Sequence, residues 1–187
     1  MIEMKFYKEE KLWIADSSYE DYKKLKFVFG TSAVGGPTFW HENGQSTNLP
    51  MEMEGELRTV AEQVLEGTPI KVGQMNSAWI REYGPGGFSR CHHHTKKNHG
   101  VFTMCIYFDE AEQEHEGDEL SPVINRHAPG NLYCVLPRSN QTAICRTFAP
   151  APGRVVIFPA TMFHGTVPCR KSRKVLVADF HWYSDKK

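Results

Sequence analysis

The segment that decides the fold of this 187-residue chain is PGRVVIFPATMFHGTVPCRKSRKVLVADFHWY, residues 152–183. It contains two apolar strand candidates, at residues 154–159 and 174–183, which are rich in Val, Ile and Phe. His164 follows the first candidate after a short turn, and a basic cluster precedes the second. The segment therefore predicts two consecutive strands, with a histidine placed between them.

Strand candidates of the same kind occur earlier in the chain, separated by clusters of Gly, Pro and Asn. They span residues 77–83, 101–108, 131–136 and 142–148. Six short strands with no helix between them predict a mainly β fold, a sandwich or a jelly-roll barrel, and argue against an α/β sheet. A helix is predicted only at residues 54–66, where apolar residues recur at helical spacing and Gly67 follows as a stop signal.

The organisation of the chain follows from these elements. Residues 29–52 are rich in Gly, Ser, Thr, Pro and Asn and are predicted to form a loop that serves as a lid or an entrance wall. We expect residues 1–76 to be an N-terminal α/β arm with this loop and the supporting helix. The arm would belong to the same domain as a β-core formed by residues 77–187, because the length suits one domain.

The composition excludes several classes of protein. A hydrophobic content of 40% is enough for a packed core and excludes chain-wide disorder. Because 22 basic residues balance 22 acidic residues, no nucleic-acid or membrane partner is indicated. No apolar run reaches the roughly 18 residues of a membrane span, and the charged N-terminus does not resemble a signal peptide. Five cysteines without a CxxC pair predict reduced thiols and a cytoplasmic location.

The histidines are the strongest functional signal, because four of the nine fall in RCHHHTKKNH, residues 90–99. On an extended strand His92 and His94 point to the same face, about 7 Å apart, and His93 points away. The pair can converge on one metal ion, with His164 as the best candidate for a third ligand, because jelly rolls bring distant strands together at the barrel mouth. The alternative is a surface patch of histidines, with His164 hydrogen-bonded beside a turn.

The order of these features resembles the 2-oxoglutarate and Fe(II)-dependent oxygenases, particularly the prolyl-hydroxylase-like branch. That family has a His-x-Asp pair, a distal His, and an Arg or Lys about ten residues after it. Here YGPGGF, starting at Tyr83, leads into His92, and EGDEL (116–120) stands where the family has a Gly-Gly-x-Leu turn. Small phage and cyanobacterial members with His-x-His in place of His-x-Asp are more similar still. The resemblance covers roughly residues 77–183.

The resemblance implies a double-stranded β-helix, jelly-roll or cupin-like, that holds Fe(II) through His92, His94 and His164. It also implies 2-oxoglutarate and dioxygen as cosubstrates and hydroxylation of a small-molecule or peptidyl substrate. A basic residue would bind the far carboxylate of 2-oxoglutarate. We favour Lys174 over Arg173, because Lys174 shares strand parity with Leu176, Ala178, Phe180 and Trp182, a stripe expected to face inward, whereas Arg173 falls on the opposite parity. Tyr83 is a candidate for a hydrogen bond to the cosubstrate, or else an aromatic residue at the barrel rim.

The sequence departs from the family at His94, which stands where the family has an aspartate ligand. Three imidazoles also suit a cupin-type metalloenzyme, a dioxygenase or an isomerase, that uses no 2-oxoglutarate. Two other arrangements remain open: His94 does not coordinate the metal, or Asp118 or Glu119 reaches it, although the chain spacing disfavours the latter. A third interpretation is a non-enzymatic β-module whose histidines bind metal or a partner. We rank the 2-oxoglutarate oxygenase first and this module last.

Overall fold

The computed structural model describes residues 3–7, 12–25, 41–94, 100–110, 117–119, 129–138 and 141–184. The α-helix is α1 (Glu54–Val64), and two short 3-10 helices are η1 (Glu20–Lys24) and η2 (Met51–Met53). The strands are β1 (Glu3–Tyr7), β2 (Leu12–Ser18), β3 (His41–Asn48), β4 (Ile70–Ser89), β5 (Val101–Tyr107), β6 (Gly117–Glu119), β7 (Leu132–Arg138), β8 (Gln141–Phe148), β9 (Arg154–Pro159), β10 (His164–Thr166) and β11 (Arg173–Ser184).

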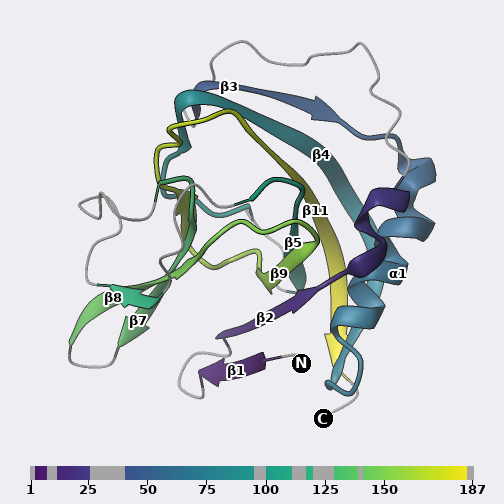
Figure 1. Cartoon of the computed structure of the whole chain (residues 1–187). Helices are drawn as coiled ribbons and strands as arrows, with labels where there is room; N and C mark the ends of the chain where they lie inside the picture. Colours follow the sequence, from purple (N-terminus) through teal and green to yellow (C-terminus); the bar gives the residue numbers. More distant parts are fainter. Residues whose placement is uncertain are drawn as a thin grey trace.

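The strands form two antiparallel sheets. The large sheet has the order β1-β2-β9-β5-β11-β4-β3, and the small sheet has the order β10-β7-β8-β6. The segment that decides the fold passes from β9 in the large sheet to β10 in the small sheet and back to β11, as a jelly roll requires. Figure 1 shows the long, curved strands β4 and β11 side by side, with α1 on one side of them and the β7–β8 hairpin on the other. The predicted mainly β, double-stranded β-helix is confirmed.

Both faces of the large sheet are covered, one by α1 and the other by the small sheet. Alternate residues of its central strands point to opposite faces, so each face presents its own set of buried side chains. One face packs with the apolar side of α1, and it presents Met104, Ile106, Ile157, Leu176, Ala178 and Phe180. The other face turns toward the small sheet, and it presents Cys105, Tyr107, Val156, Phe158, Val175 and Val177. The stripe predicted to line the inside of the barrel from Leu176 to Phe180 therefore belongs to the α1 side. A strand buried on both faces gives no apolar signal that tells one face from the other.

The helix predicted at residues 54–66 is confirmed as α1. Of the loop predicted at residues 29–52, residues 29–40 lie outside the described residues, and the prediction was wrong for residues 41–48, which form β3. This strand pairs antiparallel with β4, which runs from residue 70 to residue 89. The sequence of β3, HENGQSTN, lacks apolar alternation because the strand lies at the sheet edge, where backbone pairing to β4 holds it.

The N-terminal arm joins the large sheet at two places. The β2 strand pairs with β9, and β3 extends the opposite edge beyond β4. The boundary expected after residue 76 falls inside β4. The helix in the described part of the chain is too short to cross a membrane. All five cysteines are free thiols.

Candidate functional site

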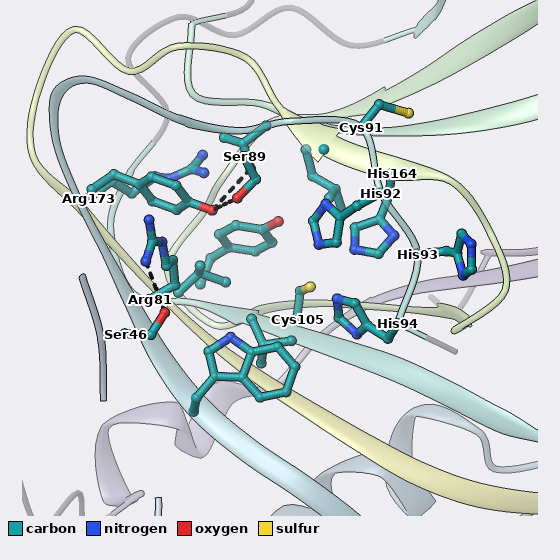
Figure 2. A pocket seen from close by; sticks show the side chains of 18 of the residues that line it. Ser46, Arg81, Ser89, Cys91, His92, His93, His94, Cys105, His164 and Arg173 are labelled. Carbon is teal, nitrogen blue, oxygen red and sulfur yellow. Dashed lines mark hydrogen bonds between the residues drawn. The ribbon is translucent and has the colours of Figure 1, made fainter. Parts of the chain in front are cut away.

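Three histidines converge between the two sheets. The nitrogens that His92, His94 and His164 offer to a metal lie within 4.8 Å of one another. Backbone pairing brings the two segments together, because His92 and His164 exchange two N–H···O bonds of 2.9 Å and the His94 amide donates to the Ala160 carbonyl at 3.0 Å. Figure 2 shows the three rings facing one another, with His93 turned away. The structure thus brings together all three predicted ligands.

The Nδ1 atom of each ring is already engaged by an oxygen acceptor. His92 Nδ1 lies 2.6 Å from the Arg90 carbonyl, and His164 Nδ1 lies 2.9 Å from the Met162 carbonyl. Because a carbonyl oxygen only accepts, both Nδ1 atoms carry the proton, and the Nε2 lone pairs are left for a metal ion. Burial also lowers the pKa of His92, and it lowers that of His164 well below 6.5, which favours the neutral rings that bind metals.

His94 differs from the other two rings, because its Nδ1 atom meets a carboxylate. Asp179 Oδ1 and Oδ2 lie 3.0 and 3.1 Å from this nitrogen, and the Thr103 hydroxyl donates to Oδ1 at 2.8 Å. Asp179 is 4% exposed and lies on β11 directly opposite Thr103 of β5. Sequence reasoning missed this role. The available signal was a single acidic residue within the apolar run VLVADF.

The histidines stand at one end of a cavity of about 740 Å³ between the sheets. Its wall on the large sheet consists of alternate residues of three neighbouring strands: Trp79, Arg81 and Tyr83 of β4, Arg173, Val175 and Val177 of β11, and Cys105 and Tyr107 of β5. Phe163 and His164 to Thr166 line the side of the small sheet. The volume lies in the range of sites for small molecules and cofactors.

Arg173 is the basic residue of β11 that faces this cavity, and it is only 5% exposed. Its guanidinium carbon lies 5.1 Å from the centre of the Tyr83 ring and 5.7 Å from that of Tyr107. The Nε and Nη1 atoms of Arg173 have no hydrogen-bond partner among the described residues. A buried guanidinium with free donors provides a site for a carboxylate.

The prediction that Lys174 points inward was wrong. Its side chain is exposed at the start of β11, on the parity of the α1 side, and its ammonium group pairs with Glu82 Oε1 of β4 at 2.7 Å. The parity argument failed for the reason given above: it identified two faces of β11 but took the α1 side for the cavity side. Tyr83 is 4% exposed and lines the cavity, which is a deeper position than the barrel rim. Its hydroxyl lies 2.5 Å from Ser89 Oγ and 3.4 Å from Thr166 Oγ1.

Asp118 and Glu119 do not lie near the histidines along the sheet. They belong to β6, which β7 and β8 separate from β10, the strand that begins at His164. Three strand spacings amount to about 14 Å. Among the described residues, the carboxylate that contacts one of the three histidines is Asp179, which lies behind His94. The sequence reasoning overlooked this residue.

Comparison with known proteins agrees with this geometry. The sequence model of the 2OG-Fe(II) oxygenase superfamily matches residues 78–182, more than half of the chain. The chain belongs to the 2OG-Fe(II) oxygenase superfamily. The matched residues include the three histidines, Tyr83 and Arg173. No curated protein matches this member of the superfamily.

Solved structures of the superfamily are similar to this oxygenase-family chain in fold. A prolyl-4-hydroxylase from Pseudomonas putida has a TM-score of 0.56 and 16% identity, covering 79% of this chain and 76% of that one. An oxidoreductase of the 2OG-Fe(II) oxygenase family from Burkholderia pseudomallei has a TM-score of 0.51 and 15% identity, covering 75% and 69%. A prolyl hydroxylase from Trichoplax adhaerens, solved with a hypoxia inducible factor peptide, has a TM-score of 0.51 and 12% identity, covering 74% and 62%.

Proposed function

We propose that this protein is an Fe(II)- and 2-oxoglutarate-dependent dioxygenase that hydroxylates a C–H bond of a small-molecule or peptidyl substrate. The observation that supports the proposal is the pairing of two features across one cavity. Three histidines with engaged Nδ1 atoms stand at one end, and the buried guanidinium of Arg173 stands at the other. A metal ion would use the free Nε2 lone pairs of the histidines, and the far carboxylate of 2-oxoglutarate would accept from the unpartnered donors of Arg173.

The donor set fits a divalent transition metal. The three Nε2 atoms would occupy one side of the ion and leave other coordination positions for a 2-oxo acid and dioxygen. When bound, Fe(II) activates dioxygen; 2-oxoglutarate is converted to succinate and carbon dioxide, and one oxygen atom enters the substrate as a hydroxyl group. The electrons balance, because 2-oxoglutarate and the C–H bond each give up two of the four electrons that dioxygen takes.

The remaining steps belong to the residues of the chain. Arg173 would bind the far carboxylate through its Nε and Nη1 donors, and the Tyr83 hydroxyl would add a hydrogen bond, as the arginine and hydroxyl groups lie within one cavity. Val175 and Val177, on the same face of β11, would exclude water from the space between the carboxylate and the metal. His94 would take the ligand position that an aspartate holds in the family pattern, with Asp179 supplying negative charge behind it.

A cupin-type three-histidine metalloenzyme, a dioxygenase or isomerase that does not use 2-oxoglutarate, is the second candidate. The observation that favours it is the absence of a carboxylate from the described ligand set. The buried, unpartnered donors of Arg173 count against it, because such an enzyme needs no cation for a distal carboxylate.

One experiment separates the two candidates. Fe(II) is added to metal-free protein under anaerobic conditions, and 2-oxoglutarate is titrated while the visible spectrum is recorded. The proposal predicts a weak charge-transfer band with 2-oxoglutarate and none with succinate, followed by succinate formation on exposure to air. A thermal-shift series with the same two acids provides an independent measure of binding. A metal-loaded protein that shows neither the band nor succinate would overturn the proposal in favour of the cupin-type enzyme.

A further inference from the structure

The cavity contains a second buried guanidinium besides that of Arg173. Arg81, on β4, is 3% exposed and lies on the cavity face between Trp79 and Tyr83. Its Nη1 atom donates to Ser46 Oγ of β3 at 3.0 Å. Its Nε and Nη2 atoms have no hydrogen-bond partner among the described residues. Two donors of one buried guanidinium are thus left without a partner in the part of the chain that the structure describes.

No acidic residue compensates this charge within the described part of the chain. The described residues that line the cavity include no Asp or Glu. Asp179 lies behind His94 and is engaged by that ring and by Thr103. Removal from water lowers the pKa of Arg81 below its usual range, but a guanidinium stays protonated in proteins. An uncompensated buried charge of this kind is unfavourable unless a ligand supplies the opposite charge.

Both arginines lie against the Tyr83 ring and differ in their other neighbours. Strand register places Arg173 opposite Tyr83 and Arg81 opposite Val175, two residue pairs nearer to the histidine end. The guanidinium carbon lies 5.1 Å from the centre of the Tyr83 ring in Arg173 and 5.2 Å from it in Arg81. Arg173 also lies over Tyr107 of β5, whereas Arg81 donates to Ser46 of the edge strand β3, as Figure 2 shows. The proposed role of Arg173 thus leaves the Nε and Nη2 donors of Arg81 without an assigned acceptor.

Counting the charges indicates what the second partner is. A divalent metal ion and two guanidinium groups contribute four positive charges, while Asp179 and a bound 2-oxoglutarate dianion contribute three negative charges. One positive charge remains without a partner in this count. A carboxylate carries one negative charge and matches a guanidinium fork in shape.

We propose that Arg81 and Ser46 bind a carboxylate group of the substrate to be hydroxylated, so that the substrate is an organic acid. The inference rests on the proposed function and goes beyond it, because it assigns the substrate class and a specificity residue. The Arg81 site is two residue pairs closer to the metal than Arg173 along the sheet. The carboxylate would therefore hold the substrate between the β3 edge and the histidines, with its oxidised carbon directed at the metal.

The experiment uses full-length protein loaded with Mn(II) under anaerobic conditions and saturated with 2-oxoglutarate. Propionate, a minimal carboxylate, is titrated while the paramagnetic relaxation of its protons by Mn(II) is measured, and propionamide serves as the uncharged probe. We expect relaxation enhancement with propionate and none with propionamide. Arg81→Gln should weaken propionate binding about tenfold or more and leave the Kd for 2-oxoglutarate within about twofold of that of the unchanged protein.

Further variants keep the result interpretable. Arg81→Lys retains the charge and should keep part of the propionate affinity, which guards against misfolding of the glutamine variant. Ser46→Ala should weaken propionate binding by a smaller factor, because it removes one neutral partner of Arg81. Lys174→Gln, a change to an exposed cation on β11, is the matched control and should change neither affinity.

Two results would overturn the inference while leaving the proposed function intact. In one, Arg81→Gln binds propionate as tightly as the unchanged protein. In the other, it loses 2-oxoglutarate and propionate together, which would assign Arg81 to the cosubstrate. Failure of the unchanged protein to bind 2-oxoglutarate would instead overturn the proposed function, and titration of propionate without 2-oxoglutarate would still report on Arg81.

Discussion

His94 Nδ1 lies 3.0 Å from Oδ1 of Asp179, so that a carboxylate buried in the middle of β11 holds the ring that stands where the family pattern has an aspartate ligand. Compared with the family pattern, a carboxylate is still present, but it lies behind the His94 ring and not next to the proposed metal position. A carboxylate that accepts from the far nitrogen of a histidine orients the ring and makes its other nitrogen a stronger ligand. In the proposed metal site, the pair would substitute in part for direct carboxylate ligation.

Asp179→Asn is expected to weaken metal binding roughly 10- to 100-fold, because the amide keeps the size of the side chain but removes its charge. Competition of Mn(II) or Zn(II) between the protein and a fluorescent chelator measures the effect. Glu82→Gln, which removes a half-buried carboxylate paired with Lys174 outside the cavity, is the control and should leave the affinity unchanged. Equal metal affinities for Asp179→Asn and the unchanged protein would mean that Asp179 serves the fold alone.

His164→Ala is expected to abolish stoichiometric metal binding, because two imidazoles leave the ion without its third ligand. His93→Ala is the matched control from the same run of histidines. The His93 ring packs edge-on against Phe163, with ring centres 4.9 Å apart, and points away from the other three. The metal content after dialysis should therefore fall for His164→Ala and stay unchanged for His93→Ala. A full equivalent of metal in His164→Ala would contradict the three-histidine centre.

Arg173→Gln is expected to weaken 2-oxoglutarate binding about tenfold or more, because a charge-assisted bond to the far carboxylate is lost. The affinity of Arg173→Lys for 2-oxoglutarate should lie between those of the unchanged protein and Arg173→Gln, since an ammonium group keeps the charge without the planar fork. Lys174→Gln, one residue along β11, should bind 2-oxoglutarate normally, as its side chain pairs with Glu82 outside the cavity. Thermal shift and calorimetry with the Mn(II) protein measure the affinity for 2-oxoglutarate. A larger loss of affinity in Lys174→Gln than in Arg173→Gln would contradict this assignment and favour Lys174 as the residue that binds the carboxylate.

The stability of the metal-free protein is expected to fall as the pH decreases below 6.5. Burial holds the pKa of His164 well below this ordinary value, so the unfolded chain takes up a proton there while the folded chain does not. The free energy of unfolding then decreases by up to about 1.4 kcal/mol per pH unit for this residue, and the contribution is complete above pH 6.5. Urea denaturation at about pH 7.5 and about pH 5.5 measures the slope. His164→Gln should have a shallower slope, and an unchanged slope would show that other groups cause it.

Gly165→Ala is expected to destabilise the protein by about 1–3 kcal/mol. An added Cβ would meet the Tyr133 hydroxyl and would lie 2.8 Å from the Ser89 carbonyl oxygen, beside His164 in the cavity wall. Gly55→Ala, in the exposed first turn of α1, has no atom within 4 Å of the added carbon. This control should instead stabilise the protein by about 0.5–1 kcal/mol, through helix propensity. Thermal denaturation of both variants distinguishes close packing at Gly165 from a general effect of replacing glycine.

The success of the sequence-based predictions depended on the range of the interactions involved. Helix α1 followed from apolar residues at helical spacing, and His92 and His94 followed from their separation by two residues, because both are local patterns. Strand β3 was missed, since its polar sequence forms a strand only by pairing with β4. Its partner residues lie more than thirty positions away along the chain, beyond the reach of any local pattern.

By itself, the sequence determined which side chains were available for chemistry and the period with which they alternate along each strand. It therefore indicated the jelly roll, the three histidines, and Arg173 and Lys174 as the only two choices on β11. The tertiary structure decided which face of β11 meets the cavity, and thus chose Arg173 over Lys174. It also placed Asp179 behind His94, 85 residues away in sequence, and left two donors of Arg81 without a partner among the described residues, in a cavity whose described lining is free of carboxylates. The physical reason is that alternation defines two faces of a strand, whereas only packing against other strands and α1 gives each face its surroundings.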